Sequence, residues 1–125
     1  MALSNKGLIL INLKRYDEAL QNIDKALELQ PDLAEAWINK GITLKFLGRY
    51  EEALNTYDKA IKFQPDLPYA WYNKAGIYAL KTDKPNTLFN LSKAIEISSE
   101  AKERAKKDAD FISFWNDEEF KKIVG

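Results

Sequence analysis

The chain has 125 residues, of which 46% are hydrophobic and 12% aromatic, and its 19 lysines and arginines balance its 19 aspartates and glutamates, so the formal net charge is zero. This balance argues against nucleic-acid binding, which depends on a basic surface, and the absence of cysteine and histidine excludes thiol catalysis, disulfides and imidazole chemistry. Length and apolar content suffice for one continuous core, so we predict one elongated domain.

Residues 1–33 are predicted to form a first pair of helices. The second helix of this pair is expected to begin near Tyr16 and to end near Leu29. The longest apolar run, Leu8–Ile11, is far too short for a membrane span or a signal peptide. The chain starts within the first helical turn without a capping residue, and its first helix has few polar residues. We therefore expect either that the chain is part of a longer array or that it covers this N-terminal face by self-association.

Residues 34–67 are predicted to form a second pair of helices. Trp37, Gly41 and Leu44 recur at intervals of three and four residues, which places them on one side of a helix. A second helix shows the same periodicity at Tyr50, Ala53, Leu54, Tyr57, Ala60 and Ile61. The small residues allow two backbones to approach closely, while the large ones fill the space around the contact. The expected structure is an antiparallel helix pair.

The ends of these two helices also have sequence signals. Gly48 is expected to adopt a left-handed conformation where the chain leaves the first helix. Pro65 cannot continue the second helix, and Asp66 is expected to cap the helix that follows.

Residues 68–99 repeat this pattern less closely. Trp71 follows Trp37 after 34 residues, and Ala75 stands where the second pair has Gly41. A turn is expected near Asp83, which can cap the next helix, with Pro85 in the first helical turn. We therefore predict a third helix pair.

The last part of the chain, residues 100–125, is expected to close the stack. Glu100–Ala109 is charged and rich in helix formers, as in a helix with a solvated face. A short last helix is expected to begin at a capping box formed by Asn116 and Glu119. The residues expected to cover the end of the third pair are Phe111, Phe114, Phe120 and Ile123. Trp115 is either a chance surface aromatic residue or an anchor for another surface, and we favour the first.

These features resemble the tetratricopeptide repeat. Residues 1–99 look like three such repeats, at about 1–33, 34–67 and 68–99, and the spacing in residues 110–123 resembles the short segment that follows many prokaryotic arrays of this family. The resemblance implies an all-α, right-handed superhelical solenoid of antiparallel helix pairs. It also implies a scaffold for protein interactions, with no particular partner.

No arrangement of residues indicates catalysis. The paired carboxylates Asp17–Glu18, Glu51–Glu52 and Glu118–Glu119 lie at the starts of predicted helices, where the helix dipole favours negative charge. The serines have no histidine to activate them, and no glycine-rich phosphate loop is present. We expect no enzyme, no cofactor and no metal site.

In an array of this family, the first helices of the repeats line a concave groove. The positions that face this groove are predicted to be Leu8, Ile11, Asn12, Ile38, Ile42, Lys45, Tyr69, Tyr72 and Gly76. Tyr69 and Tyr72 lie about one helical turn apart and combine a flat ring with a polar tip, as interface anchors often do. The alternative is that the C-terminal segment folds over these residues and makes them part of the core.

Family members that bind the acidic C-termini of chaperones use a clamp of lysine, asparagine and arginine residues. Of the corresponding positions in this chain, only Asn39 matches, so this ligand class is disfavoured. The leading hypothesis is a cytoplasmic, non-enzymatic module that binds a partner peptide or helix in the groove. The alternative is a structural array that forms a homo-oligomer through its N-terminal face; neither nucleic acid nor membrane is an expected partner.

Overall fold

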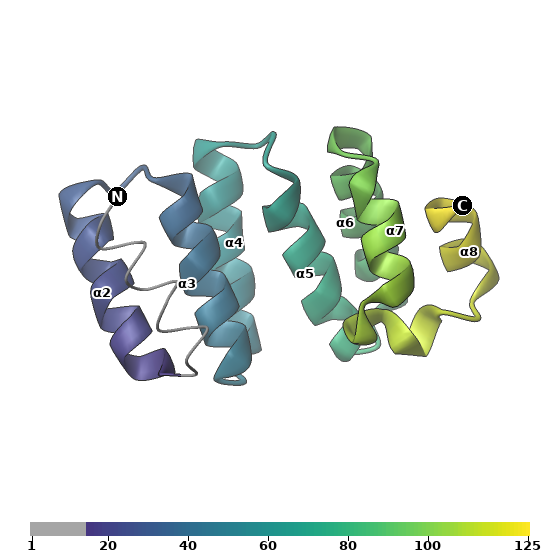
Figure 1. Ribbon diagram of the computed structural model, residues 1–125, viewed down its shortest axis with the longest axis horizontal. Coiled ribbons are helices and arrows are strands. Elements are labelled where there is room, and N and C mark those ends of the chain that lie inside the picture. Colours follow the sequence, from purple (N-terminus) through teal and green to yellow (C-terminus); the bar gives the residue numbers. More distant parts are fainter. Residues whose placement is uncertain (1–14) are drawn as a thin grey trace. The chain divides into compact units, whose positions relative to one another are not determined.

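The computed structural model describes residues 15–125, and every regular element in this range is a helix. Figure 1 shows that α3 and α4, and likewise α5 and α6, run in opposite directions. The elements in chain order are α2 (Tyr16–Leu29), α3 (Ala34–Phe46), α4 (Tyr50–Phe63), α5 (Pro68–Leu80), α6 (Lys84–Ile97), α7 (Glu100–Lys107), the 3₁₀ helix η1 (Ala109–Phe114) and α8 (Glu118–Val124). The predicted helix pairs α3/α4 and α5/α6 are confirmed, and so is the end of α2 at Leu29.

Backbone contacts divide the chain into two compact units, Met1–Pro65 and Asp66–Gly125. The border lies in the connector between α4 and α5, next to the predicted repeat boundary at residues 67 and 68. The expectation of one elongated domain stays a prediction.

The connectors follow the glycine and proline signals but not the expected cap. Gly48 has φ +76° between α3 and α4, as predicted. The first residue of α5 is Pro68, so Leu67 occupies the cap position and makes no side-chain capping bond. The expectation that Asp66 caps α5 was wrong, because this side chain lies one residue too early.

The first unit is built on close contact between α3 and α4. Gly41 is buried, and a Cβ atom placed on it would lie 2.4 Å from the ring of Tyr57, which has no exposed surface. Ala53 and Ala60 are also fully buried. Trp37 packs against a cluster that contains Ile23, and its indole N–H donates to the carbonyl of Pro31 at 2.8 Å. Small residues at the helix crossing therefore allow one large ring to fill the core.

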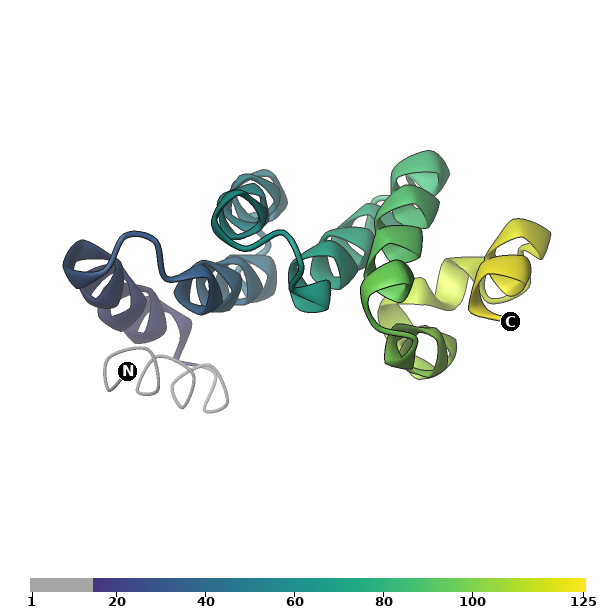
Figure 2. The same cartoon turned by 90° about the horizontal axis from the view of Figure 1, so that it is seen from above.

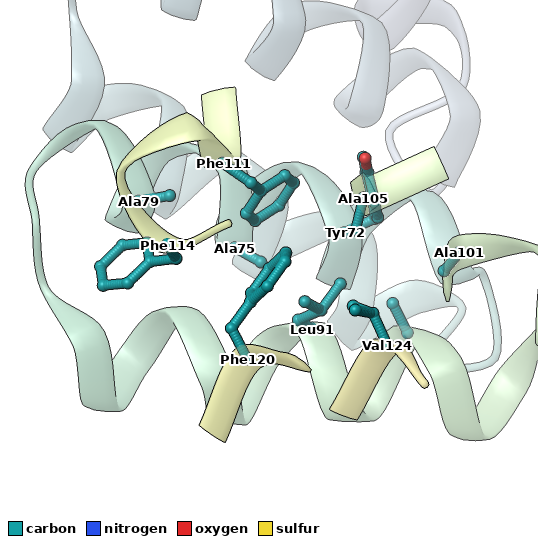
Figure 3. Packing of buried hydrophobic residues seen from close by; sticks show 11 residues of the cluster. Tyr72, Ala75, Ala79, Leu91, Ala101, Ala105, Phe111, Phe114, Phe120 and Val124 are labelled. Carbon is teal, nitrogen blue, oxygen red and sulfur yellow. The ribbon is translucent and has the colours of Figure 1, made fainter. Parts of the chain in front are cut away.

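The second unit has a core made by α5, α6 and the C-terminal segment. Figure 3 shows Phe111, Phe114 and Phe120 gathered with Ala75 and Leu91. In the view from above, the yellow α8 lies beside α6 and α7, both of which it contacts (Figure 2). The predicted covering role of the three phenylalanines is confirmed, and Ile123 packs against the same cluster.

Aspartate side chains provide the caps of α6, η1 and α8 in this unit. Asp83 accepts a hydrogen bond from the backbone N–H of Asn86, which confirms the predicted cap of α6. At α8, Asp117 Oδ1 accepts from the backbone N–H groups of Glu119 and Phe120, each at 3.0 Å. The capping box predicted at Asn116 was therefore wrong by one residue.

Asp117 also joins α8 to α6 through a lysine. Lys84 Nζ lies 2.8 Å from Asp117 Oδ2 and 2.9 Å from Glu119 Oε1. The hydrogen bond from Lys84 lowers the pKa of Asp117, and the backbone N–H of Phe120 lowers this pKa further. A lowered pKa means that the folded state favours the carboxylate. The stabilisation is therefore present above the unfolded-state pKa and is lost as the pH falls through the lower, folded-state pKa.

We expect the amide resonances of Glu119 and Phe120 to report this titration. In an NMR pH series their shared midpoint should lie below the ordinary aspartate pKa, and Lys84→Met should move it upward because the strongest cause of the shift is removed. Lys93→Met is the matched control, since Lys93 is on the same helix but pairs with Glu96 at 3.8 Å. An unchanged midpoint in Lys84→Met would contradict the role of this lysine.

Candidate interaction surfaces

In the first unit, the predicted groove residues have different environments. Leu8, Ile11 and Asn12 lie outside the described residues, as does the N-terminal face predicted to self-associate. Ile38 is buried, whereas Ile42 and Lys45 are partly exposed. The structure therefore leaves part of this face of α3 accessible, but not at Ile38.

The end of α3 presents an aromatic pair to solvent. Phe46 is 52% exposed, and its ring stacks on that of Tyr16 at a centroid distance of 5.5 Å and an interplanar angle of 11°. The Lys45 ammonium lies 5.7 Å from the centre of the Phe46 ring. This surface combines flat apolar rings with one positive charge.

In the second unit, the C-terminal segment covers two of the predicted groove residues. Tyr72 is only 4% exposed; its hydroxyl donates to Asp108 Oδ2 at 2.9 Å, and its ring meets Phe111 edge-on at 5.5 Å. A Cβ on the buried Gly76 would lie 3.4 Å from Asp110 Oδ2. Tyr72 and Gly76 thus do not line an open groove: as the alternative interpretation supposed, they are core residues, because the apolar Phe111 needs a surface to bury itself against.

Burial determines the protonation state of Tyr72. Removal of its hydroxyl from water raises the pKa of Tyr72 far above the usual range, and the hydrogen bond to Asp108 raises it further. The hydroxyl therefore remains a donor at any physiological pH. Its role is to hold the start of η1 against α5.

Tyr69, in contrast, is accessible. It is 53% exposed and borders a pocket of about 110 Å³ between α5 and α7. The other residues that line the pocket are Pro68, Tyr72, Ser98, Glu100, Ala101 and Arg104. The guanidinium carbon of Arg104 lies 4.8 Å from the centre of the Tyr72 ring. Of the second unit's predicted groove residues, Tyr69 is the one that a partner can reach.

Sequence reasoning missed Arg104 as a candidate site residue. It treated residues 100–109 as a solvated closing helix, and α7 ends at Lys107. The buried Ala101 and Ala105 mark the packed face of α7, and Arg104 immediately precedes the second of them. The sequence signal was the pair of alanines four residues apart in an otherwise charged helix. It marks one helix face, and Arg104 lies at the edge of that face.

Trp115 has a structural role that neither sequence-based interpretation named. It is partly buried against the core of the second unit, and its indole N–H donates to the carbonyl of Ala105 at 3.1 Å. This carbonyl belongs to the last turn of α7, where helical partners run out. Trp115 therefore attaches η1 to α7. It also borders a pocket of about 330 Å³ with Lys106, Phe120, Lys121, Val124 and Gly125.

In the described part of the chain, the acidic residues are the candidate metal ligands. Residues 15–125 contain no group of three or more acidic residues that could hold a metal ion. The carboxylate pairs Asp17–Glu18, Glu51–Glu52 and Glu118–Glu119 lie in first helical turns, as predicted. In the same part of the chain, no helix is both long and apolar enough to cross a membrane.

Comparison with known proteins agrees with the repeat pattern. A family model described as tetratricopeptide repeat matches residues 1–66, slightly more than half of the chain. No curated protein matches the sequence significantly.

Solved structures of helical repeat proteins are similar to this chain. YrrB, described as a TPR protein with an unusual peptide-binding site, is 31% identical with a TM-score of 0.73, covering 82% of this chain and 54% of its own. MamA MSR-1 C2 is 23% identical with a TM-score of 0.70, covering 79% of this chain and 57% of its own. A mutant of MamA is 26% identical with a TM-score of 0.65, and the match covers 74% of this chain and 54% of the mutant's chain. The chain thus spans somewhat more than half the length of these proteins.

The helix pairs, their packing residues and these similarities lead to the same conclusion. The fold is an all-α solenoid of helix pairs. The chain belongs to the tetratricopeptide repeat family.

Proposed function

We propose that this protein is a non-enzymatic interaction scaffold that binds a peptide segment or helix of a partner protein. Its family supports a protein-interaction role, and the structurally similar YrrB is described as having a peptide-binding site. The observation that carries the proposal is the 53% exposure of Tyr69 beside a pocket between α5 and α7.

The position of Tyr69 suits it to anchor a ligand. It is the second residue of α5, directly after Pro68, whose ring fixes the backbone at the helix start. A tyrosine has few rotatable bonds, so ordering it on binding costs little entropy, and covering its ring removes a large apolar area from water. Tyrosine is for these reasons common among residues that dominate binding energy.

The accessible face of α3 is proposed as a second contact region, within the first unit. Ile42 and Lys45 are partly exposed there, and Phe46 with its stacked partner Tyr16 adds aromatic surface. Ile38, Tyr72 and Gly76 act on binding indirectly, by supporting the helices that carry the accessible residues.

The test uses peptides selected from a random library for binding to the wild-type chain. We expect Tyr69→Ala to weaken the selected peptides by tenfold or more, since truncating a central aromatic anchor costs about 2 kcal/mol or more. Leu80→Ala is the matched control: it truncates another exposed apolar residue of α5, 41% exposed, at the opposite end of the helix. Dissociation constants from isothermal titration should change less than twofold for this control.

Two outcomes would count against the proposal. Failure to select any peptide that binds with a defined stoichiometry would remove the binding function. If Tyr69→Ala and Leu80→Ala reduced the peptide affinity equally, Tyr69 would not be the residue of α5 that the peptide contacts. Sedimentation over a dilution series addresses the alternative of self-association, because a strictly monomeric species at all concentrations excludes it.

A further inference from the structure

The Tyr69 pocket contains a positive charge that the first helices of the repeats do not provide. Arg104 comes from α7, after the three predicted repeats, and its guanidinium carbon lies over the ring of Tyr72, 4.8 Å from the ring centre. Among the described residues, no carboxylate forms an ion pair with Arg104 and no side chain hydrogen-bonds to it. Its donors are therefore held beside the pocket without an anionic partner.

The cation–π contact with Tyr72 prepares this guanidinium for a ligand. Contact with the face of an aromatic ring holds the planar group in one orientation and leaves the N–H donors at its edge available. Tyr72 itself cannot move, because it is buried and its hydroxyl donates to Asp108. This same hydrogen bond gives the Asp108 carboxylate a partner other than Arg104.

From this arrangement we infer that the Tyr69 pocket recognises a partner segment in which an acidic side chain follows or precedes an apolar residue. The carboxylate binds the edge of Arg104, and the apolar neighbour covers Tyr69. A carboxylate accepts two parallel hydrogen bonds from a guanidinium, which gives both strength and orientation. This inference rests on the proposed function, since it names the ligand of the same pocket.

The other charge at the pocket limits the ligand to one acidic group. Glu100 lines the pocket on the same helix as Arg104, and it repels a second negative charge brought close to it. A side-chain carboxylate within a continuing segment therefore fits better than a run of acidic residues. It also leaves residues on both sides of the acid to reach Tyr69, which lies on the other helix.

The test uses a library-selected peptide whose binding requires Tyr69. Replacing its acidic residue by the matching amide should weaken binding to the wild-type chain about tenfold, as expected for loss of a charge-assisted hydrogen bond. The same replacement should change the affinity for Arg104→Gln less than twofold, because the partner group is already absent. Lys107→Gln is the control, since it removes an equal charge from the exposed end of α7, outside the residues that line the pocket. The C-terminus of the peptide is also a carboxylate. Its amidation should leave the dissociation constant unchanged if Arg104 binds the acidic side chain.

The outcomes separate this inference from the proposed function. If Tyr69→Ala abolishes binding but the acid-to-amide replacement has no effect, the function stands and the carboxylate inference is overturned. Equal losses in Arg104→Gln and Lys107→Gln would also overturn it, because they would indicate attraction by net charge alone. If amidation of the peptide C-terminus weakens binding and the acid-to-amide replacement does not, the carboxylate that Arg104 binds is the chain end. This result would reject an acidic side chain as the ligand. Amide spectra of both variants establish that each remains folded.

Discussion

Replacing Gly41 by alanine is expected to destabilise the first unit by about 1–3 kcal/mol, as overpacking of a buried site does. The added Cβ would lie 2.4 Å from the ring of Tyr57, closer than carbon atoms can approach. The ring has no exposed surface, so it cannot move aside without displacing the core. Alanine favours helix over glycine by about 1 kcal/mol, and this gain offsets only part of the cost. Thermal unfolding followed by circular dichroism measures the difference.

The helix pair α5/α6 shows how the clash can be relieved. There, 34 residues later, Ala75 replaces Gly41 and Leu91 replaces Tyr57, and both are fully buried in one cluster. The variant Gly41→Ala/Tyr57→Leu should therefore be more stable than Gly41→Ala, although Tyr57→Leu alone removes volume from a filled core and costs stability. A double-mutant cycle should give a favourable coupling of at least about 1 kcal/mol. Additive losses would contradict this explanation.

Gly76→Ala is the matched control for a buried helical glycine. The nearest atom to its added Cβ would be Asp110 Oδ2 at 3.4 Å, an ordinary contact. Alanine favours the helix over glycine by about 1 kcal/mol, and no steric clash offsets this gain. We expect this variant to be as stable as the wild type or slightly more stable.

Phe111→Ala is expected to destabilise the second unit by about 3–5 kcal/mol, the range for removal of a buried phenylalanine. Phe111 has no exposed surface and joins two rings, Tyr72 at 5.5 Å and Phe120 at 5.9 Å. Its loss removes the contact that holds η1 on α5 and α8 on the core. Amide hydrogen exchange should become much faster at Lys121 and Gly125, whose backbone bonds close the turns of α8.

The neighbouring Ile112 provides the comparison for Phe111. It is 61% exposed, so Ile112→Ala should change stability by no more than about 0.5 kcal/mol, as surface substitutions usually do. If Phe111→Ala were tolerated as well as Ile112→Ala, the C-terminal segment would not depend on this ring. The contrast matters for binding because the same segment covers Tyr72 and carries Arg104.

The local structure was largely readable from residue type and spacing. Intervals of three and four residues identified the faces of the helices, and Gly48 and Asp83 marked a turn and a cap that the structure confirms. The errors at Asp66 and Asn116 were shifts of one residue. At α8 two neighbouring polar residues can cap the helix, and the position of the first turn selects Asp117. At α5 the first turn begins at Pro68, which leaves Leu67 at the cap position.

The surface proposed for binding was only partly predictable. Tyr69 and Tyr72 have the same sequence signal, yet one is 53% exposed and the other 4%. The difference arises from Asp108 and Phe111, which lie far along the chain and contact Tyr72. Arg104 was missed for the same reason, since its contact with Tyr72 joins two helices that are separated in sequence.

By itself, then, the sequence determined that the chain is a set of helix pairs with small residues at their crossings, because helical periodicity and close packing depend on residues within one repeat. Tertiary structure alone decided which residues of α5 are covered and which remain open. The exposure of each α5 residue depends on where the apolar C-terminal segment buries its phenylalanines. The spacing of residues within one repeat does not determine this position.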